Sequence, residues 1–284
     1  MKILRSVSVK KKILIAAVIC LFAATAFAAS PLDVFKGQKG KIDIAGGTAH
    51  IPVMKEAAKR IMGANPDIRI TVAGGGSGVG VKQAGEGLVE IGNTGRPLKK
   101  DEIEKYGLES FPFAIDGVAV VVNPANKVGE LSFEQLIDIY AGKITNWKEV
   151  GGSDAEINLY VREDGSGTRE VFTDKAIKKG SVAAKANVVN SNGAMKTAVA
   201  KDARAIGYVG IGHIDSSVKA PKLAGMTATQ ENAANGKYSV VLDLFMNTKG
   251  KPEGLTALFI DYIYSPEGAQ IIKDSGYIPL PRKK

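Results

Sequence analysis

Hydrophobic and polar residues recur along the chain with two different periods. Short runs in which every second residue is apolar, such as Ile157, Leu159 and Val161, predict strands, and longer stretches with apolar residues three and four apart predict helices. The predicted strands cover residues 41–45, 68–73, 90–93, 117–123, 157–161, 187–190, 206–209 and 239–246. The predicted helices cover residues 51–64, 79–87, 99–105, 132–140, 168–179, 193–201 and 253–273. Residues 1–40 and 214–238 give the weakest pattern.

Strands and helices alternate, which favours parallel βαβ units and the α/β class. Abundant glycine and few aromatic residues suit a fold with many tight strand-to-helix turns. The last predicted helix is interrupted at Ser265-Pro266, where proline suits the first turn of a new helix, so we expect two helices there.

Three predicted strands are each followed by a turn that contains glycine and a hydroxyl residue, and then by a helix. The turns are Ala45–His50, Gly74–Gly80 and Arg162–Glu170. Glycine lets the backbone approach a ligand closely. The first N–H groups of a helix have no partner within it, and the positive end of the helix dipole lies there. The turns therefore predict one oxyanion held by several helix ends, with Arg162 as a forked cation, although each turn alone is also consistent with an ordinary capped helix start.

The three turns differ from known nucleotide-binding loops. None ends in the Gly-Lys-Ser/Thr of a P-loop. Gly74-x-Gly76-x-x-Val79 lacks the third glycine of the dinucleotide fingerprint, and a frame that starts at Gly75 fails at Ser77. Nucleotide binding is therefore the weaker interpretation.

Seven pieces of the sequence, spread over nearly the whole chain after residue 40, form a combination that is more specific than any single motif. They are residues 46–48 (GGT), 76–78 with 81–83 (GSG with VKQ), 116–124 (DGVAVVVNP), 144–147 (ITNW), 162–168 (REDGSGT), 205–209 (AIGYV) and 265–268 (SPEG). In this order they resemble the periplasmic phosphate-binding proteins of bacterial phosphate ABC importers, a phosphate-specific transport family of the type II periplasmic-binding-protein class.

This resemblance implies an α/β protein with two lobes, each a mostly parallel sheet flanked by helices, that closes on one phosphate in the cleft between them. It implies no enzymatic activity and no cofactor. The run 111–123 is expected to carry the chain from the first lobe to the second, and the run 205–212 to return it. We therefore expect residues 29–114 plus 213–284 in lobe 1 and residues 115–212 in lobe 2.

The resemblance also implies a set of ligand residues. Carried over residue by residue, the phosphate contacts are Thr48, Ser77, Arg162, Ser166, Gly167 and Thr168, and possible further contacts are Ala49, Gly78, Thr94, Arg96 and Gly165. Asp164 would hold Arg162 in place. Some family members have an aspartate that accepts the proton of phosphate, and Gly95 stands at that position here. Arg96, which follows it, is either an additional ligand or a surface residue.

Residues 1–28 are typical of a secretory signal peptide. Basic residues precede an apolar stretch from Ile13 to Ala26 that is too short to span a bilayer comfortably, and cleavage is expected after Ala28. Cys20 lacks a small residue before it, since Ile19 is not small, so we expect no lipid anchor. The predicted location is the periplasm, and the predicted partner is the membrane permease of a phosphate ABC transporter.

Removal of the signal peptide changes the bulk properties of the chain. Cys20 is the only cysteine, so the mature chain would contain no disulfide. The formal charge would fall from +9 to +4, because five basic and no acidic residues precede residue 29. The remaining basic residues are mixed with acidic ones and form no stripe that would suit nucleic acid.

Two other classes of function remain open. The same anion site could bind sulfate, molybdate or tungstate, an alternative supported only by the missing aspartate. A phosphohydrolase would need a nucleophile with a base, or a metal cluster, and neither is visible. The histidines, His50 and His213, have no carboxylates at ligand spacing, and Trp147 is expected to be structural packing. Residues 190–193 (NSNG) either cap a helix or also face the cleft.

Overall fold

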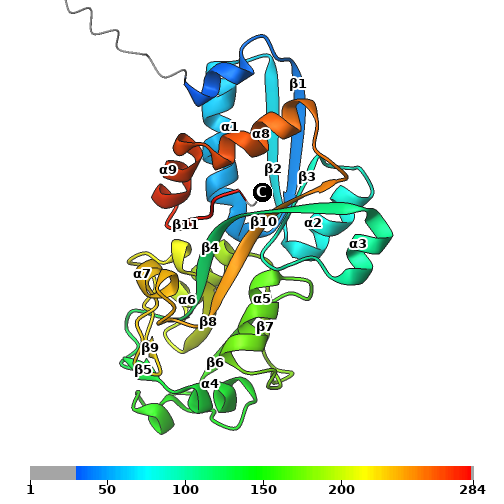
Figure 1. Ribbon diagram of the computed structural model, residues 1–284. Helices are drawn as coiled ribbons and strands as arrows, with labels where there is room; N and C mark the ends of the chain where they lie inside the picture. Colours follow the sequence, from blue (N-terminus) through cyan, green and yellow to red (C-terminus); the bar gives the residue numbers. More distant parts are fainter. Residues whose placement is uncertain (1–29, 283–284) are drawn as a thin grey trace, which may run out of the picture. The chain divides into compact units, whose positions relative to one another are not determined.

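The computed structural model describes residues 30–282 (Figure 1). The predicted signal peptide, its cleavage after Ala28 and the Cys20 question lie outside these residues. The residues from Pro31 onward form one unit. Within the described range, no helix combines the length and the apolar character that crossing a bilayer requires.

Helices and strands alternate through the described residues. The strands are β1 (Gly40–Gly46), β2 (Ile68–Gly75), β3 (Ile91–Thr94), β4 (Leu108–Val122), β5 (Glu130–Leu131), β6 (Asn158–Arg162), β7 (Asn187–Val189), β8 (Ala205–Gly210), β9 (Lys222–Leu223), β10 (Val241–Lys249) and β11 (Ile278–Pro279). The α-helices are α1 (Ile51–Ala64), α2 (Gly76–Gly85), α3 (Lys100–Tyr106), α4 (Phe133–Tyr140), α5 (Gly167–Val171), α6 (Asn192–Lys201), α7 (Gln230–Ala234), α8 (Gly254–Tyr264) and α9 (Pro266–Asp274). Short 3-10 turns cover Pro31–Phe35, Thr48–His50, Trp147–Val150 and Ile211–His213, and a π-helical turn covers Phe172–Ala176.

The main sheet has the strand order β2-β1-β3-β10-β4-β8-β6-β7, with β11 added to β4. The pairs β1–β2, β1–β3, β6–β8 and β6–β7 are parallel. The pairs that involve β10 and β4 are antiparallel. The sheet therefore has a parallel set of strands at each end, and an antiparallel pair joins them.

Strand β4 connects the two parallel sets. Its residues Leu108–Gly117 pair with β10, and its residues Val118–Val122 pair with β8. Figure 1 shows β4 and β10 in the middle of the unit, with β1 to β3, α1, α8 and α9 toward one end and β6 to β8 with α4 to α7 toward the other. The carboxyl ends of β1, β2 and β6, which lead into the three glycine-containing turns, face the region between these two groups.

Local sequence explains where several helices begin. The hydroxyl oxygens of Ser132, Ser166 and Ser191 accept hydrogen bonds from backbone N–H groups three residues later, the expected geometry of an N-cap. Ser265 caps α9 in the same way and Pro266 occupies its first position, so the expected break between α8 and α9 is confirmed.

The structure differs from the predicted elements in several places. The helix predicted for residues 168–179 is α5 followed by the π-helical turn, and ends at Ala176, since Lys178 and Lys179 have positive φ angles. Strand β4 begins at Leu108 rather than near residue 117, and α2 begins at Gly76 rather than near residue 79. The weakly patterned region 214–238 contains β9 and α7.

One hydrophobic core runs through both parallel sets of strands. It contains Trp147, which is 2% exposed and whose indole nitrogen donates to the Arg204 carbonyl oxygen at 2.9 Å, so its predicted packing role is confirmed. Near the end of β6, the rings of Phe172 and Tyr208 stack with centroids 3.9 Å apart. The Tyr208 hydroxyl oxygen accepts a hydrogen bond of 2.9 Å from the backbone N–H of Arg162, so the core fixes the strand end from which the candidate cation projects.

Candidate functional site

The three glycine-containing turns meet around one small cavity. It is lined by Gly47, Thr48, Ala49, His50, Gly76, Ser77, Gly95, Arg162, Ser166, Gly167 and Thr168. The cavity volume is about 10 Å³, on the order of one water molecule, so it has no room for a nucleotide. The six residues that the resemblance implied as phosphate contacts, and Ala49 among the possible ones, all lie in its wall.

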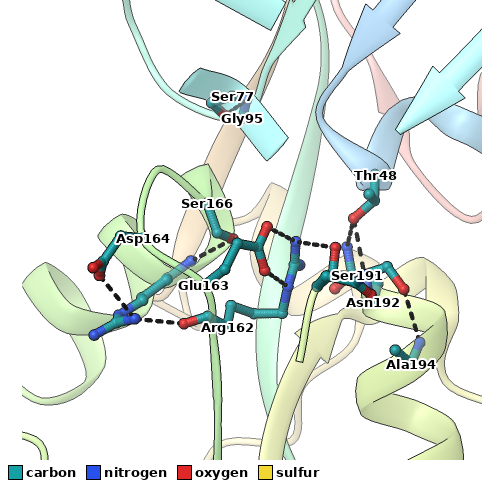
Figure 2. A network of polar contacts seen from close by, with 12 residues as sticks. Thr48, Ser77, Gly95, Arg162, Glu163, Asp164, Ser166, Ser191, Asn192 and Ala194 are labelled. Carbon is teal, nitrogen blue, oxygen red and sulfur yellow. Dashed lines mark hydrogen bonds and ion pairs between the residues drawn. The ribbon is translucent and has the colours of Figure 1, made fainter. Parts of the chain in front are cut away.

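The hydroxyl groups in the wall are arranged to donate hydrogen bonds. Thr48 Oγ1 accepts from the backbone N–H of Asn192 at 3.3 Å and from its Nδ2 at 3.2 Å, which uses both acceptor positions of the hydroxyl oxygen (Figure 2). Ser77 Oγ accepts from the backbone N–H of Gly95 at 3.0 Å, and Ser166 Oγ accepts from that of Arg169 at 3.3 Å. Because each oxygen already accepts from the protein, its O–H is left to donate, which suits the oxygen atoms of an anion.

Arg162 supplies a buried positive charge to the same wall. The residue is 1% exposed, and its Nε and Nη2 each donate to the Glu163 carboxylate at 2.9 Å. Its Nη1 is buried and has no hydrogen-bond partner within residues 30–282. A buried donor without a partner is costly, so Nη1 is the natural contact for a ligand in the cavity.

The carboxylate that orients Arg162 is Glu163, and the expectation that Asp164 does so was wrong. Asp164 has a side chain that is 97% exposed and pairs with Arg169 at 3.0 Å. Figure 2 shows the Glu163 carboxylate facing the Arg162 guanidinium, while the Asp164 carboxylate lies away from it. Arg169 in turn donates to the Arg162 carbonyl oxygen at 2.6 Å, which ties α5 to the end of β6.

Close packing of glycines positions Ser77. A Cβ atom on Gly80 or on Gly46 would collide with the carbonyl oxygen of Asn93. A larger residue at either position would therefore push α2 away from β1 and β3, and Ser77 would move with it. Gly75, with φ of 132°, adopts a backbone conformation that other residues rarely do and turns the chain from β2 into α2.

Residues from the two ends of the sheet touch across the cavity. The Thr48–Asn192 hydrogen bonds are one contact, and the Gly78 N–H donates to the Gly165 carbonyl oxygen at 3.0 Å in another. Ser191 caps α6 while Asn192, the next residue, contacts Thr48 (Figure 2). The segment 190–193 thus both caps a helix and faces the cleft.

The other possible contacts lie outside the cavity wall. The Thr94 hydroxyl donates to the Arg96 carbonyl oxygen at 2.8 Å and accepts from Asn247 at 3.1 Å. The Arg96 side chain binds Glu102 and Glu170. Gly78 and Gly165 are bonded to each other through their backbones.

His50, the last residue of the turn Ala45–His50, also lines the cavity, although no ligand role was expected for it. It is fully buried, and neither ring nitrogen has a hydrogen-bond partner within the described residues. Burial lowers the pKa of His50 to about 4, opposed by the nearby carbonyl groups of Gly47, Thr94 and Phe245, so the ring is neutral near pH 7. Within residues 30–282, no group of three His, Cys, Asp or Glu side chains is placed to bind a metal ion.

Asp116 is a second buried ionisable group near the centre of the molecule, outside the cavity wall. It is fully buried on β4, and its Oδ1 accepts from Gln230 at 2.9 Å, while Oδ2 has no partner within the described residues. Burial raises the pKa of Asp116 to about 7, and the hydrogen bond from Gln230 opposes that change.

Comparisons with known proteins agree with this architecture. Residues 35–267 match the PBP superfamily domain. The chain is 36% identical over 258 residues to the phosphate-binding protein PstS of Bacillus subtilis, covering 89% of this chain and 86% of that protein. It is 29% identical over 251 residues to PstS of Borreliella burgdorferi, covering 84% and 90% of the two chains.

Two solved structures are similar over most of the chain. A protein from Clostridium perfringens assigned as a phosphate ABC transporter substrate-binding protein, with phosphate bound, is 37% identical with a TM-score of 0.79, and the match covers 85% of this chain and all (100%) of that one. An ABC-type phosphate transport receptor from Vibrio cholerae is 36% identical with a TM-score of 0.68, and the match covers 84% and 100% of the two chains.

Proposed function

Because the chain belongs to the PBP superfamily and, within it, to the phosphate-binding proteins of ABC transporters, we propose that it captures inorganic phosphate and delivers it to an ABC importer. It is a two-lobed binding protein of the type II class and not an enzyme, as its relatives are transport proteins. The observation that carries the proposal is the cavity wall of hydroxyl donors, helix N-termini and one buried arginine.

The residues proposed to bind phosphate are Thr48, Ser77, Arg162, Ser166, Gly167 and Thr168, with Ala49 beside them. Arg162 Nη1 and the hydroxyl groups of Thr48, Ser77 and Ser166 donate to the phosphate oxygens. The backbone N–H groups of Gly167 and Thr168, at the start of α5, have no partner within the helix and complete the set of donors.

The proposed lobes are residues 29–114 plus 213–284 and residues 115–212. The change of partner along β4, from β10 to β8 at Gly117–Val118, supports a crossing within 111–123. The return through β8 supports the second crossing. Phosphate between the lobes would favour the closed form by its higher affinity for it.

Binding proteins of this type act outside the cytoplasm. We place this one in the periplasm, on the support of the signal-like residues 1–28, and its partner is the membrane permease of a phosphate ABC transporter. Sulfate, molybdate and tungstate remain the competing ligands, because Gly95 occupies the position of the family's proton-accepting aspartate and lies in the cavity wall.

Calorimetric titration of the phosphate-stripped protein tests the proposal. We expect one phosphate site per chain and a rise in melting temperature with phosphate, since a ligand that binds only the folded form stabilises it by mass action. Sulfate, arsenate, molybdate and tungstate are titrated in parallel. Tighter binding of molybdate or tungstate than of phosphate, or steady release of phosphate from p-nitrophenyl phosphate, would contradict the proposal.

A further inference from the structure

Arg96 is a buried arginine that lies next to the phosphate cavity but outside its wall. It is 7% exposed. Its Nη1 and Nη2 donate to the Glu102 carboxylate at 2.8 and 2.7 Å, and its Nε lies 2.8 Å from Glu170 Oε2 in an ion pair whose angle is poor for a hydrogen bond. Lys99 Nζ lies 3.6 Å from the other oxygen of Glu170. The two acidic and two basic groups balance, so the cluster adds no net charge beside the anion site.

The two carboxylates that hold Arg96 come from opposite sides of the cleft. Glu102 is on α3, on the same side as Arg96, while Glu170 is on α5. Helix α5 also carries Gly167 and Thr168 of the cavity wall. The contact between Arg96 and Glu170 therefore holds the phosphate-contacting end of α5 against the turn that contains Gly95.

Solvent-filled grooves flank this contact. One groove of about 500 Å³ contains Arg96, Lys99 and Glu170 in its wall, and another of about 460 Å³ contains Lys99 and Glu170. Both grooves have Lys99 and Glu170 in their walls, so Glu170 lies where the two grooves meet. The Thr48–Asn192 contact, in contrast, involves Thr48 of the cavity wall.

We propose that Arg96 and Glu170 form a cross-cleft clasp that sets the balance between the open and closed forms and so the residence time of phosphate. The clasp rests on the proposed function, because it acts on closure around that ligand. Arg96 is a positioning residue here and does not touch phosphate.

Arg96 and Glu170 differ in what each side chain contacts when the cleft opens, and this difference allows the opening to be reversible. When the cleft opens, Arg96 keeps its two hydrogen bonds to Glu102 and so does not become an unpaired buried charge, while Glu170 moves into solvent with α5. The contact therefore adds to the stability of the closed form without trapping it. A contact made only in the closed form raises the observed affinity by shifting the population toward the binding-competent state.

The test uses Glu170→Gln, which keeps the shape of the side chain and removes its charge. We expect phosphate to bind roughly tenfold more weakly, mainly through faster dissociation in stopped-flow measurements, with little change in the melting temperature of the ligand-free protein. In an Arg96→Met background the same substitution should have almost no further effect. Asp174→Asn is the matched control, because Asp174 lines the same two grooves and carries the same charge.

The outcomes separate the clasp from the function itself. Failure of the parent protein to bind phosphate would overturn the proposed function, and the clasp with it. Normal binding by the parent together with unchanged dissociation from Glu170→Gln would overturn the clasp alone. Equal weakening by Asp174→Asn, or additive effects of Glu170→Gln and Arg96→Met, would also overturn it, since surface charge would then explain the change.

Discussion

Gly167 of α5 lies so close to Ser77 of α2 that a Cβ atom on the glycine would collide with the serine hydroxyl oxygen. The same atom would lie 3.0 Å from the carbonyl carbon of Gly95. The two residues are on opposite sides of the cleft. The absence of a side chain at Gly167 is therefore what allows the two walls of the cavity to meet.

Gly167→Ala should prevent full closure. We expect phosphate affinity to fall at least tenfold, or about 1.4 kcal/mol, with little change in ligand-free melting temperature, since the collision exists only in the closed form. Calorimetry measures the affinity. Gly193→Ala is the control, because the nearest atom to its Cβ would be Ser191 Oγ at 3.9 Å. An unchanged affinity in Gly167→Ala would show that closure does not require this contact.

Arg162→Ala should abolish tight phosphate binding and leave the fold intact. Loss of a charge-assisted partner from a buried anion costs roughly 2–5 kcal/mol. Arg162→Lys should restore part of the affinity, since an ammonium group cannot pair with Glu163 and also reproduce the fork. Titration calorimetry measures both variants, with Arg60→Ala, which removes a partly exposed arginine paired with Glu56 and Glu267, as the control. Binding by Arg162→Ala within about threefold of the parent, under 1 kcal/mol, would mean that another group carries the charge.

The sequence predicted the parts of the site that local pattern determines. Ser77, Ser166 and Thr168 each follow a strand and begin a helix, so their place at one edge of the sheet follows from their order along the chain. The turn Ala45–His50 and the cation Arg162 were part of the same predicted anion site, and both Thr48 and Arg162 line the cavity.

The other features of the site and of the sheet depend on side-chain directions and tertiary pairings, which the hydrophobic pattern of the sequence does not specify. Glu163 and Asp164 are adjacent acidic residues, and only the folded turn decides that the first faces Arg162. The surroundings of Arg96 could not be predicted, because its ion-pair partner Glu170 lies 74 positions later in the sequence (170 minus 96). Likewise the antiparallel insertion of β10 between β3 and β4 is a tertiary pairing that the strand pattern of residues 239–246 does not specify.

Asp116→Asn should remove one source of pH dependence from folding stability. Burial raises the pKa of Asp116 to about 7. The folded state therefore holds a proton that the unfolded state has lost, so the contribution of Asp116 to stability is complete below its unfolded pKa of about 4 and decreases as pH rises toward 7. The amide of asparagine does not titrate, so Asp116→Asn loses no stability by this route. The variant should therefore gain stability relative to the parent as pH rises from 4 to about 8.

Urea denaturation of both proteins at several pH values measures this difference. The comparison between them cancels the effect of His50 and His213, which has the opposite sign. Loss of solvent around these rings lowers their pKa values to about 4, so their contribution to folding stability decreases as pH falls below about 6.5. A stability difference that is constant with pH would show that Asp116 is ionised in the folded protein throughout.

Phosphate recognition without the family's aspartate should give a distinctive pH profile. A buried carboxylate beside the ligand would repel a fully deprotonated oxyanion and favour one that carries a proton. With Gly95 at that position and Arg162 in the wall, phosphate affinity should hold or rise as phosphate becomes dianionic near neutral pH. Asn192 fills both acceptor positions of the Thr48 hydroxyl oxygen, while the hydroxyl oxygens of Ser77 and Ser166 each keep one free acceptor position. Sulfate has no proton to donate, so it leaves unpaired only those protein acceptors that would have accepted the proton of phosphate. Because this site has few such acceptors, its rejection of sulfate should be weaker than that of a site with a carboxylate.

Gly95→Asp should sharpen the rejection of sulfate, and Gly95→Ala separates charge from size. A Cβ atom at this position would lie 2.8 Å from Leu242 Cδ1, the end of a side chain that must shift in both variants. Phosphate and sulfate are titrated from mildly acidic to mildly alkaline pH at constant ionic strength. If the parent binds phosphate more tightly at acidic pH and binds no sulfate, another acidic group must accept the proton. Glu163 would then be the first candidate, because its Oε1 would lie 3.1 Å from a Cβ atom on Gly76 of the cavity wall, whereas the Asp164 side chain is exposed and pairs with Arg169.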